Sequence, residues 1–550
     1  MASLQFTEGP SIPEPYIKRK QLLNHMVDGL AQARPFSVWA EIPNSATSYG
    51  AGFRRVTYRD LSNAINGVAW WLYNALGKGT GFKTLAYIGL WDVRYVILLL
   101  GAVKAGYTMV FPSSKYNLAG LEKLLAEVDC KIFLTIPESP PVVSAFIKAH
   151  KAPELSVPTV YELLNTEFQF FPLDKIFSTA RKEPLVCLHT SGSTSYPKPV
   201  VWTHDFAASF IQQHQYQPPP GFDSVDKYFQ GNRLVPMLPI SHAGNLFTTL
   251  FIAIGSQTTV IFPLPNAKVS AETLVQILQH NTADAAIGSP NVIEQLARSP
   301  DMRQIVFGKI HALGYSGGDI SRNAGDTLAT DATLFNIYGS TETGVTPTIR
   351  SKQRLDVHDW KRVEPHPNSG FEFRRLADNE YEAVIVRNSI EDEEQPVFKV
   401  FPDLKEWPTK DIFTPNPVNP GSWIYGRRTD DLLIFSDGTS FNPLEFEQQI
   451  SGHPEIKAAL MFGTRRPQAA LLIELEDPRG PSEDGHSETM ERLWPIIAEA
   501  NGMCTAQSVI QKSHILFTQA ENPLPRAGKE TVQRARAFQM YEAELSSLYI

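Results

Sequence analysis

The sequence has few cysteines, no excess of basic side chains and no long apolar run. Its three cysteines, Cys130, Cys187 and Cys504, are too few and too far apart for a disulfide framework or a zinc site, so we expect a reducing compartment. With 58 acidic and 50 basic residues the net charge is −8, which argues against nucleic acid as the main partner. The longest apolar run, Tyr95 to Val103, is well short of a membrane span.

We recognise no targeting signal in the first 15 or the last three residues of the sequence. Residues 1–15 lack the apolar segment of a signal peptide, and the last three residues, 548–550, are not a peroxisomal signal. Together with the short apolar runs, these absences predict a cytoplasmic protein without a membrane partner.

What the sequence does contain is an ordinary globular composition, with 43% hydrophobic and 20% charged residues. At roughly 150 residues per domain, its 550 residues correspond to three or four folding units. Helical and strand-like apolar patterns alternate from about Tyr58 onward. The first predicted helices span 61–76, 93–104 and 121–128, and the first predicted strands span 84–90 and 131–135. This alternation predicts parallel sheets covered by helices, an α/β architecture.

A proline-rich loop, Phe413 to Trp423, is the best candidate for a domain boundary. We therefore divide the chain into a large N-terminal core, 1–425, with two or three sheets, and a small C-terminal α+β domain, 426–550. In the small domain we predict strands over 432–435, 456–462, 469–475 and 514–517, a turn at Asp437 and Gly438, and helices over 443–451, 488–501 and 531–548.

The strongest local signal is LVCLHTSGSTSYPK, residues 185–198. Small hydroxyl residues around a glycine allow backbone N–H and side-chain O–H groups to converge on an anion, and a lysine adds positive charge. The segment predicts a phosphate-holding loop; the alternative is a flexible turn between a strand and the helix predicted after Trp202, which Thr203 or Asp205 can cap. A Walker A motif is absent, because Gly528 and Lys529 are followed by Glu530. The residues of the predicted loop are Thr190, Ser191, Gly192, Ser193, Thr194, Ser195 and Lys198.

This loop resembles the phosphate loop of the adenylate-forming superfamily, which includes acyl-CoA synthetases, luciferases and the adenylation domains of nonribosomal peptide synthetases. Further motifs of that superfamily follow in the same order: YSGGD at 315–319, NIYGSTE at 336–342, YGRRTDDLLIFSDG at 425–438 and LPRAGK at 524–529. The segments HTSGSTSYPKPVVWTH and DDLLIFSDGTSFNPLEFE are most similar to adenylation domains of fungal adenylate-forming carboxylic acid reductases. The resemblance implies a large multi-sheet α/β adenylation core and a small, mobile C-terminal domain.

The resemblance also assigns roles to individual residues and implies ATP and Mg²⁺ as cofactors. Lys529 is the catalytic lysine that bridges the substrate carboxylate and the α-phosphate, and Glu342 is the magnesium ligand. Thr341 is expected to bind the α-phosphate, Tyr338 to stack on adenine and Asp411 to hold the ribose hydroxyls. These roles suit the chemistry, because two anions must be brought together and their charge offset. Further nucleotide contacts implied by the resemblance are Ser316, Gly317, Gly318, Asn336, Gly339, Ser340 and Arg428.

Three departures from the superfamily pattern are visible. Asp411 lies in TKDIF rather than the usual tyrosine, threonine, glycine, aspartate run. Ser195 stands where many relatives have glycine, which costs of order 1 kcal/mol if that position needs a positive φ. The extra Arg427 shifts the hinge register by one residue. Asp430 is our hinge candidate, about which the small domain rotates after adenylation, and Asp431 is the alternative.

The segment PMLPISHAGNLF, residues 236–247, resembles the motif that lines the acid pocket and gates the thiol tunnel. Residues 235–247 contain no acidic side chain to pair with a substrate ammonium, so an ordinary α-amino acid is disfavoured. An aryl or aliphatic carboxylic acid fits better. The pocket residues implied by the resemblance are His242, which occupies the gating position, Ala243, Asn245 and Tyr315. His189 and His204, which border the phosphate loop, are interpreted as structural.

We expect ATP-dependent formation of an acyl adenylate with release of pyrophosphate, followed by transfer to the phosphopantetheine thiol of a carrier domain. After Lys529 there is no carrier-protein serine motif, and no strand is followed by the G-x-G-x-x-G of a reductase domain. The chain is therefore either the excised first domain of a larger protein or an enzyme that passes its acyl group to a separate thiol. The alternatives are a free-standing acyl-CoA ligase, with CoA as acceptor, and a non-catalytic nucleotide-binding module.

Overall fold

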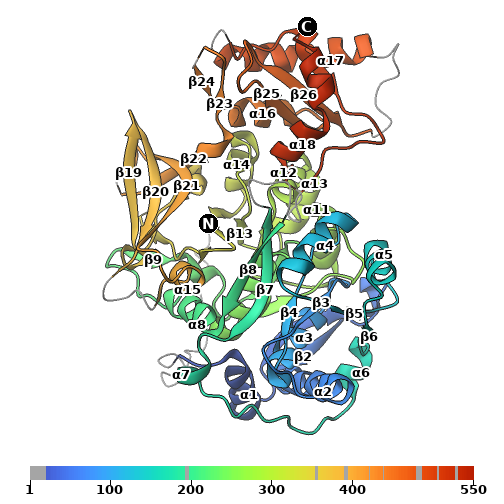
Figure 1. Cartoon of the computed structure of the whole chain (residues 1–550). Coiled ribbons are helices and arrows are strands. Elements are labelled where there is room, and N and C mark those ends of the chain that lie inside the picture. The colour runs from blue at the N-terminus through green and yellow to red at the C-terminus, as the bar shows by residue number, and fades with distance from the viewer. Residues whose placement is uncertain are drawn as a thin grey trace.

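The computed structural model describes most of the chain. It covers residues 20–191, 197–353, 357–388, 394–419, 421–437, 439–477, 486–504, 507–526 and 531–549. Three large sheets with flanking helices form the main body, and a smaller α+β unit at the C-terminal end lies at the top of Figure 1. The predicted α/β class, with a large multi-sheet N-terminal core and a small C-terminal part, is confirmed.

A six-stranded sheet in the order β6-β5-β3-β4-β7-β8 occupies the N-terminal part of the body. It is parallel up to β7, and β8 runs antiparallel to β7. Its strands are β3 (Thr84–Tyr87), β4 (Thr108–Val110), β5 (Ile132–Thr135), β6 (Glu154–Ser156), β7 (Pro184–Ser191) and β8 (Pro197–Thr203). Neighbouring helices are α2 (Tyr58–Leu76), α3 (Arg94–Ala105), α4 (Leu118–Glu127), α5 (Pro141–His150), α6 (Val160–Asn165) and α7 (Phe177–Ala180).

The local sequence explains these helices well. Thr57 and Asp60 form a reciprocal capping box that starts α2, and Gly77 ends it with φ 78°. Every residue of α3 is buried, so the longest apolar run of the sequence is a central core helix. No helix within the described part of the chain is both long and apolar enough to cross a bilayer.

A seven-stranded sheet in the order β14-β13-β12-β10-β11-β1-β2 forms the second half of the body, parallel except for β2. Met237, Gly288, Tyr315 and Asn336 stand side by side in register at the carboxyl ends of four strands. The segments that follow these residues therefore meet at one sheet edge. The strands are β1 (Val38–Pro43), β2 (Phe53–Thr57), β10 (Arg233–Met237), β11 (Thr259–Ile261), β12 (Ala285–Gly288), β13 (Ala312–Tyr315) and β14 (Thr333–Asn336).

The helices of this half include one π-helical turn. It spans Phe247–Ile252 and joins two short α-helices directly after the HAGNLF segment. Such π-helical turns occur frequently at functional sites. The helices are α1 (Leu23–Ala33), α8 (His204–Gln213), α9 (Ala243–Leu246), α10 (Ala253–Ser256), α11 (Ala271–His280), α12 (Pro290–Arg298), α13 (Pro300–Phe307) and α14 (Arg322–Ala329).

A five-stranded antiparallel sheet, β18-β22-β21-β20-β19, fans out at the left of Figure 1. The proline-rich loop that we took as a boundary connects β21 to β22 within this sheet, so the division at 425 falls inside β22. The strands are β18 (Arg362–Val363), β19 (Phe371–Ala377), β20 (Glu380–Val386), β21 (Glu406–Pro415) and β22 (Trp423–Arg428), and α15 (Val397–Val400) lies beside them.

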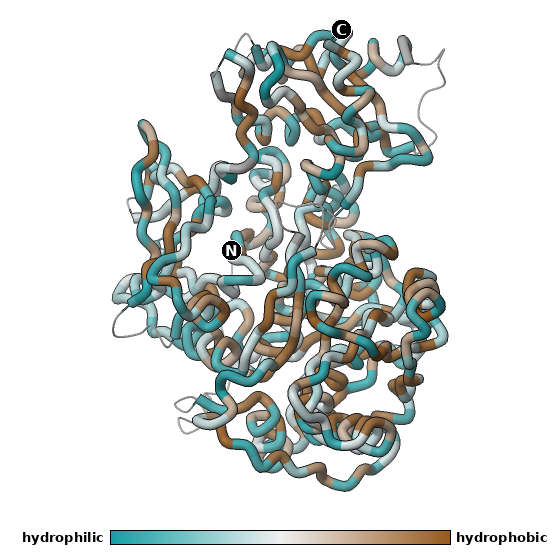
Figure 2. The backbone as a smooth tube through the Cα atoms, in the orientation of Figure 1, coloured by the Kyte–Doolittle hydropathy of each residue, from teal (hydrophilic) through white to brown (hydrophobic). Residues whose placement is uncertain are grey.

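The C-terminal unit has apolar clusters of its own. One is built around Phe446, Met461 and Leu471, and a second contains Leu472, Ala537 and Tyr541. In Figure 2 brown hydrophobic stretches run through the elements of this unit as they do through the sheets below. Its elements are β23 (Leu433–Ile434), β24 (Ser440–Phe441), α16 (Leu444–Ser451), β25 (Ile456–Phe462), β26 (Ala470–Leu475), α17 (His486–Ala500), β27 (Ile515–Phe517), α18 (Arg534–Met540) and α19 (Glu542–Ser547).

One predicted element of this unit is wrong in form. The single terminal helix expected over 531–548 is two helices, interrupted at Tyr541, which has φ −107° and ψ 19°. The Tyr541 hydroxyl accepts from the backbone N–H of Gln519 and donates to the carbonyl of Asn522, which anchors the break to a distant loop. The helix also begins later than predicted, because Val532 pairs with Arg526 in an isolated β-bridge.

Candidate active site

The predicted phosphate loop connects the two strands of the β7–β8 hairpin. Thr190 pairs with Lys198 and Ser191 with Pro197, so both ends of the loop are held in antiparallel register. The expectation of one strand running into a turn and then a helix missed β8, which separates the loop from α8. Thr203 caps α8 by accepting from the N–H of Phe206, as predicted. Of the predicted loop, Gly192, Ser193, Thr194, Ser195 and the side chain of Ser191 lie outside the described residues.

His189 braces the base of this hairpin as a neutral imidazole. Its Nε2 lies 3.2 Å from the carbonyl oxygen of Phe111, which only accepts, so Nε2 carries the proton. Its Nδ1 therefore accepts from the Tyr116 hydroxyl at 2.5 Å. Burial lowers the pKa of His189 to about 4, which agrees with this tautomer. The ring positions the strand that leads into the phosphate loop, in line with the structural role expected for it.

The NIYGSTE motif forms a tight β-hairpin, with β15 (Gly339–Ser340) paired to β16 (Gly344–Val345). Ser340 and Thr343 hold the turn, because each backbone N–H donates to the hydroxyl of the other residue, at 3.1 and 3.2 Å. The turn itself carries Thr341, which is buried, and Glu342, which is half-buried. These are the two side chains predicted to meet the α-phosphate and the metal.

Two contacts lock this hairpin to the body. The indole N–H of Trp202 donates to the carbonyl of Thr341 at 2.8 Å, and the indole ring stacks on Phe206. At Gly339 the backbone of the opposite strand approaches so closely that an added Cβ would lie 2.3 Å from the carbonyl oxygen of Gly344. Only glycine fits there, which explains the glycine of the motif.

Three residues predicted to contact the nucleotide meet at the Asp411 carboxylate. The Tyr338 hydroxyl donates to Oδ2 of Asp411 at 2.5 Å, and Arg428 Nη1 lies 3.4 Å from Oδ1. Asp411 and Arg428 are register partners on β21 and β22. Burial and the negative charge of Asp411 raise the pKa of Tyr338 well above its usual value, so the phenol stays protonated and donates.

The YSGGD segment lies against this cluster at the ends of β13 and β14. The Asn336 amide donates to the buried Tyr315 hydroxyl at 3.2 Å, and the Ser316 hydroxyl donates to the carbonyl of Ile337 at 2.9 Å. Gly317 has φ 94°, a conformation that favours glycine. The structure therefore brings the two nucleotide motifs together, as their places on adjacent strands require.

A narrow cavity of about 20 Å³ lies between these motifs and α9. Ser316 and Gly244 line it, so it joins the predicted nucleotide segments to the predicted acid pocket. His242, Ala243, Asn245 and Tyr315 are immediate chain neighbours of lining residues but do not themselves line it. Most of its wall is apolar and comes from Phe229, Leu238, Phe247, Ile252, Ile287 and Ile337.

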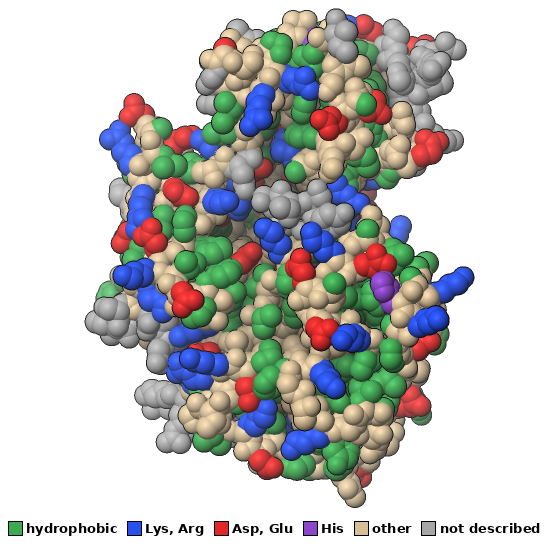
Figure 3. Space-filling view, in the orientation of Figure 1, with side chains coloured by type: hydrophobic (Ala, Val, Ile, Leu, Met, Phe, Trp, Pro, Cys, Tyr) green, Lys and Arg blue, Asp and Glu red, His purple; other side chains and the backbone are tan. Residues whose placement is uncertain are grey.

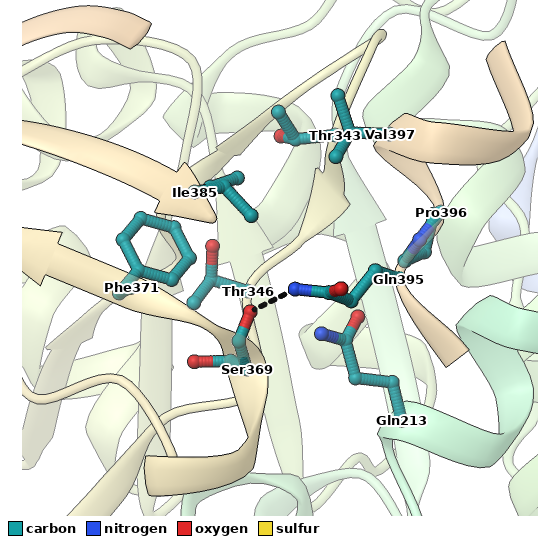
Figure 4. A pocket seen from close by; sticks show the side chains of 9 residues that line it. All are labelled: Gln213, Thr343, Thr346, Ser369, Phe371, Ile385, Gln395, Pro396 and Val397. Carbon is teal, nitrogen blue, oxygen red and sulfur yellow. Dashed lines mark hydrogen bonds between the residues drawn. The ribbon is translucent and has the colours of Figure 1, made fainter. Parts of the chain in front are cut away.

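A second cavity, shown in Figure 4, lies beside the same hairpin but fits a structural role. The Gln395 amide crosses it and donates to the carbonyls of Ser369 at 3.2 Å and Val386 at 2.9 Å. Its oxygen accepts from the N–H of Asn388 at 2.8 Å. The Gln395 side chain is fully hydrogen-bonded to backbone groups, so it braces β20 against α15. We therefore assign this cavity a structural role rather than acid binding.

Lys529 lies outside the described residues, but the residues on both sides of its loop are placed. Arg526 and Val532 form an antiparallel bridge that brackets the loop, and Arg526 is paired with Glu474 at 2.5 Å. Thr531 approaches the YSGGD segment, because its Cγ2 is 3.8 Å from a Cβ built on Gly318. The residue that follows this loop thus reaches the adenine-side segment of the main body.

Positive charge gathers along the junction between the C-terminal unit and the body. Figure 3 shows several Lys and Arg side chains there. Partial desolvation of the exposed Lys115, together with the nearby charges of Arg526 and Lys457, lowers its pKa to about 8. A junction of this kind suits a polyphosphate, and sequence reasoning missed Lys115 because no local motif marks it.

The hinge candidate lies in a single 3₁₀ turn, Thr429–Asp431, directly after β22. Asp431 Oδ1 is 3.9 Å from Arg534, whose guanidinium also forms a 2.5 Å ion pair with the buried Glu447. The side chain of Asp430 is outside the described residues. The structure therefore connects the turn to α16 and α18 through Asp431.

The donor set near the hairpin suits magnesium held largely by phosphates. Among the described residues no group of three or more His, Cys, Asp or Glu side chains is arranged to hold a metal ion. Glu342 offers a single carboxylate on the turn of the hairpin. Magnesium commonly binds through one or two carboxylates plus substrate phosphates and water, so one such ligand fits.

Comparison with protein families identifies the chain. The model of the AMP-binding enzyme family matches residues 36–372, and that of the AMP-binding enzyme C-terminal domain matches residues 430–550. The chain therefore belongs to the AMP-binding enzyme family of the adenylate-forming superfamily. Within it the chain is a carboxylate-adenylating enzyme, similar over most of its length to fungal carboxylic acid and adenylate-forming reductases.

The relatives are longer than this chain. A carboxylic acid reductase of Neurospora crassa is 30% identical over 547 residues, covering 97% of this chain and 51% of that protein. The isocyanide synthase-NRPS hybrid crmA of Aspergillus fumigatus is 29% identical, covering 97% of this chain and 34% of that protein. The chain thus spans about half, or less, of the length of these relatives.

Solved structures share the fold. The A domain of a carboxylic acid reductase from Segniliparus rugosus, in complex with AMP and a co-purified carboxylic acid, superposes with a TM-score of 0.71 at 15% identity. That match covers 98% of this chain and 95% of the other. ATP-bound MatB from Rhodopseudomonas palustris gives a TM-score of 0.68 at 16% identity, covering 95% and 100%.

Proposed function

We propose that the chain activates a carboxylic acid with ATP and passes the acyl group to the phosphopantetheine thiol of a carrier domain. In this role it is the adenylation unit of a carboxylate reductase related to peptide synthetases. The observation that carries the proposal is that the two nucleotide motifs adjoin the acid-pocket segment, and that Thr531, just after the C-terminal lysine motif, lies against Gly318. Such an arrangement supports in-line attack of a bound carboxylate on a bound triphosphate.

The first half-reaction needs positioning and charge compensation. A carboxylate oxygen of the acid attacks the α-phosphorus, the new bond is the acyl–phosphate bond of the adenylate, and pyrophosphate leaves. Lys529 is proposed to offset the charge on both anions, and Thr341 to donate to the α-phosphate. Thr531 against Gly318 supports this role, because it brings the flank of the lysine loop to the nucleotide segment.

The remaining nucleotide roles follow from the cluster around Asp411. We assign adenine to the Tyr338 wall and the ribose hydroxyls to Asp411, whose carboxylate can accept from a diol and lies beside Tyr338 and Arg428. Glu342 is proposed to hold Mg²⁺, which supplies Lewis-acid charge compensation at the phosphates. The backbone N–H groups between Thr190 and Lys198 are proposed to hold the phosphates that leave.

We also propose the division into residues 1–425 and 426–550, with a hinge at Asp430. After adenylation the small domain would turn about this point, removing Lys529 and presenting a second face to the adenylate. The contact of Arg298 Nη2 with the carbonyl of Ser451, at 2.7 Å, is one that such a turn must break.

The decisive experiment is carboxylate-dependent exchange of labelled pyrophosphate into ATP over a panel of acids. Exchange with at least one acid supports the proposal and names the substrate class. Absence of exchange with every acid would favour the non-catalytic nucleotide-binding module. A thioester assay that offers CoA and a holo-carrier separately distinguishes the carrier-dependent unit from a free-standing acyl-CoA ligase.

Lys529→Ala is expected to lower the exchange rate by orders of magnitude with ATP binding largely retained, because the lysine acts on the developing charge rather than on the adenosine. Lys512→Ala is the matched control, since Lys512 lies in the same C-terminal part but pairs with Glu491 on the surface, at 2.6 Å. An unaltered exchange rate in Lys529→Ala would remove the catalytic assignment.

A further inference from the structure

A buried histidine–aspartate pair borders the narrow cavity between the nucleotide motifs and α9. His214 follows α8 and is one of the residues lining that cavity. Its Nδ1 lies 2.8 Å from Oδ1 of Asp226, which sits in the 3₁₀ turn Val225–Tyr228. Its Nε2 lies 3.0 Å from the carbonyl oxygen of Val345 on the NIYGSTE hairpin. The side chains of His214 and Asp226 are 6% and 10% exposed, so water does not compete for these contacts.

The hydrogen bonds define the protonation state of His214. A backbone carbonyl only accepts, so Nε2 must donate to Val345. The other oxygen of Asp226, Oδ2, accepts from the Ser224 hydroxyl at 3.0 Å. Asp226 raises the pKa of His214, which favours the form in which Nδ1 donates to the carboxylate as well. Both ring nitrogens therefore carry protons, and His214 is an imidazolium.

The electrostatics agree with this geometry. Burial by itself lowers the pKa of His214, but the charge of Asp226 and the hydrogen bonds to Asp226 and Val345 outweigh it and raise the pKa overall. A phenyl ring, that of Phe210, covers the imidazolium with a centroid distance of 4.4 Å, which is a favourable place for a cation.

Only one member of the His214–Asp226 pair lines the cavity. His214 lines it, whereas Asp226 does not, so the imidazole ring rather than the carboxylate forms part of the cavity wall. The two lining hydroxyls are already used, since Ser316 donates to Ile337 and Thr248 donates to the carbonyl of Gly244 at 2.9 Å. No described lining residue is a carboxylate. The wall therefore opposes a substrate ammonium, which would be desolvated beside a fixed cation.

We infer that His214 is a specificity-determining residue of the acid pocket: held as an imidazolium by Asp226, it selects carboxylic acids whose remaining atoms are uncharged and apolar. Phe229 and Phe247 in the same wall favour an aromatic ring in that part of the acid. The inference rests on the proposed function, because it concerns which acid the adenylation site accepts. Asp226 is a positioning residue that acts through His214.

The test compares acids that differ by a single ammonium group. Pyrophosphate exchange is measured with 3-phenylpropanoate against phenylalanine, and with 4-methylbenzoate against 4-(aminomethyl)benzoate. We expect kcat/KM to be at least 100-fold higher for the uncharged acid of the pair that is accepted. His214→Gln and Asp226→Asn remove the charge or its counter-ion and are expected to lower this ratio at least tenfold.

His150→Gln is the matched control, because His150 forms a comparable 2.9 Å pair with Glu122 on the surface, with side chains 47% and 36% exposed. It should keep the wild-type ratio. The ratio is the informative quantity, since a merely structural role of His214 would lower kcat/KM for both acids of a pair equally.

The outcomes separate the two proposals. Equal use of both acids of a pair, or preference for the ammonium acid, overturns the role of His214 while leaving adenylation intact. A wild-type ratio in a folded His214→Gln or Asp226→Asn also overturns it, and if one variant does not fold, the other and the wild-type ratio decide. Absence of exchange with any acid, charged or uncharged, removes the proposed function and the inference together.

Discussion

Asp411 is the residue on which the proposed nucleotide-binding side chains converge. Its two oxygens meet Tyr338 and Arg428, which come from different elements, and its own N–H donates to the Thr409 hydroxyl at 3.1 Å. The preceding residue, Lys410, has φ 65°, so the strand is locally irregular at this point. The unusual TKDIF sequence thus leaves the Asp411 carboxylate in contact with Tyr338 and Arg428.

Asp411→Asn is expected to weaken ATP binding about 10- to 100-fold, because charge-assisted hydrogen bonds contribute about 1.5–3 kcal/mol and the amide keeps only one acceptor oxygen. Isothermal titration with ATP measures the effect. The control is Asp378→Asn on the same sheet, where the side chain is fully exposed and paired with Arg375. Unchanged ATP affinity in Asp411→Asn would remove Asp411 from the nucleotide site.

At the residue scale, motif residues were predictable and their partners were not. Tyr338, Asp411 and Arg428 were each predicted from a local sequence motif, and the structure brings them together. His214 carried no signal, since its importance depends on Asp226 and on Val345, which is 131 positions away. A lone histidine in sequence does not reveal which acceptors surround it.

At the scale of elements, the β15–β16 hairpin is the part that we expect to tolerate substitutions least. It presents Thr341 and Glu342 from a turn closed by Ser340 and Thr343, and its strands are too close at Gly339 for any side chain. The indole of Trp202 then fastens the turn to the body. A small displacement of this hairpin moves the proposed magnesium and α-phosphate ligands together.

Gly339→Ala is expected to abolish exchange, because its Cβ would lie 2.3 Å from the carbonyl oxygen of Gly344 and the hairpin must open to relieve the clash. Pyrophosphate exchange and the thermal unfolding midpoint are measured in parallel. Gly502→Ala is the control, since an added Cβ there meets nothing within 4 Å. Wild-type exchange in Gly339→Ala would contradict the close approach.

Element types were predicted better than element ends. The strand over 456–462 matches β25 residue for residue, and the helix over 61–76 lies within α2. The terminal helix failed because its interruption at Tyr541 is caused by hydrogen bonds to residues 519 and 522, which no helical periodicity contains. The strand β8 was missed for a similar reason, since its pairing with β7 is a non-local contact.

At the scale of the whole molecule, buried neutral histidines make stability depend on pH. Burial lowers the pKa of His189 and of His204 to about 4, below the ordinary value of 6.5. The unfolded chain therefore binds more protons than the folded one between pH 6.5 and 4. The stability that these groups contribute is present above pH 6.5 and is lost as the pH falls towards 4.

His204→Gln is expected to remove part of this acid sensitivity. Relative to the variant, the wild type should lose about 2–3 kcal/mol of unfolding free energy between pH 7 and 4.5, at 1.36 kcal/mol per pKa unit. Urea denaturation of both proteins at the two pH values measures the difference. Parallel pH dependence in the two proteins would show that His204 is not held neutral in the folded state.

The sequence by itself determined the α/β class, the order of the nucleotide motifs and the side chains that those motifs contribute. These properties are local, because strand and helix periodicity and short motifs are written in neighbouring residues. Only the tertiary structure decided which segments share the cavity, the charge state of His214, the fit at Gly339 and the break at Tyr541. Each of these depends on atoms brought together from distant parts of the chain, where burial and hydrogen-bond geometry set the energy.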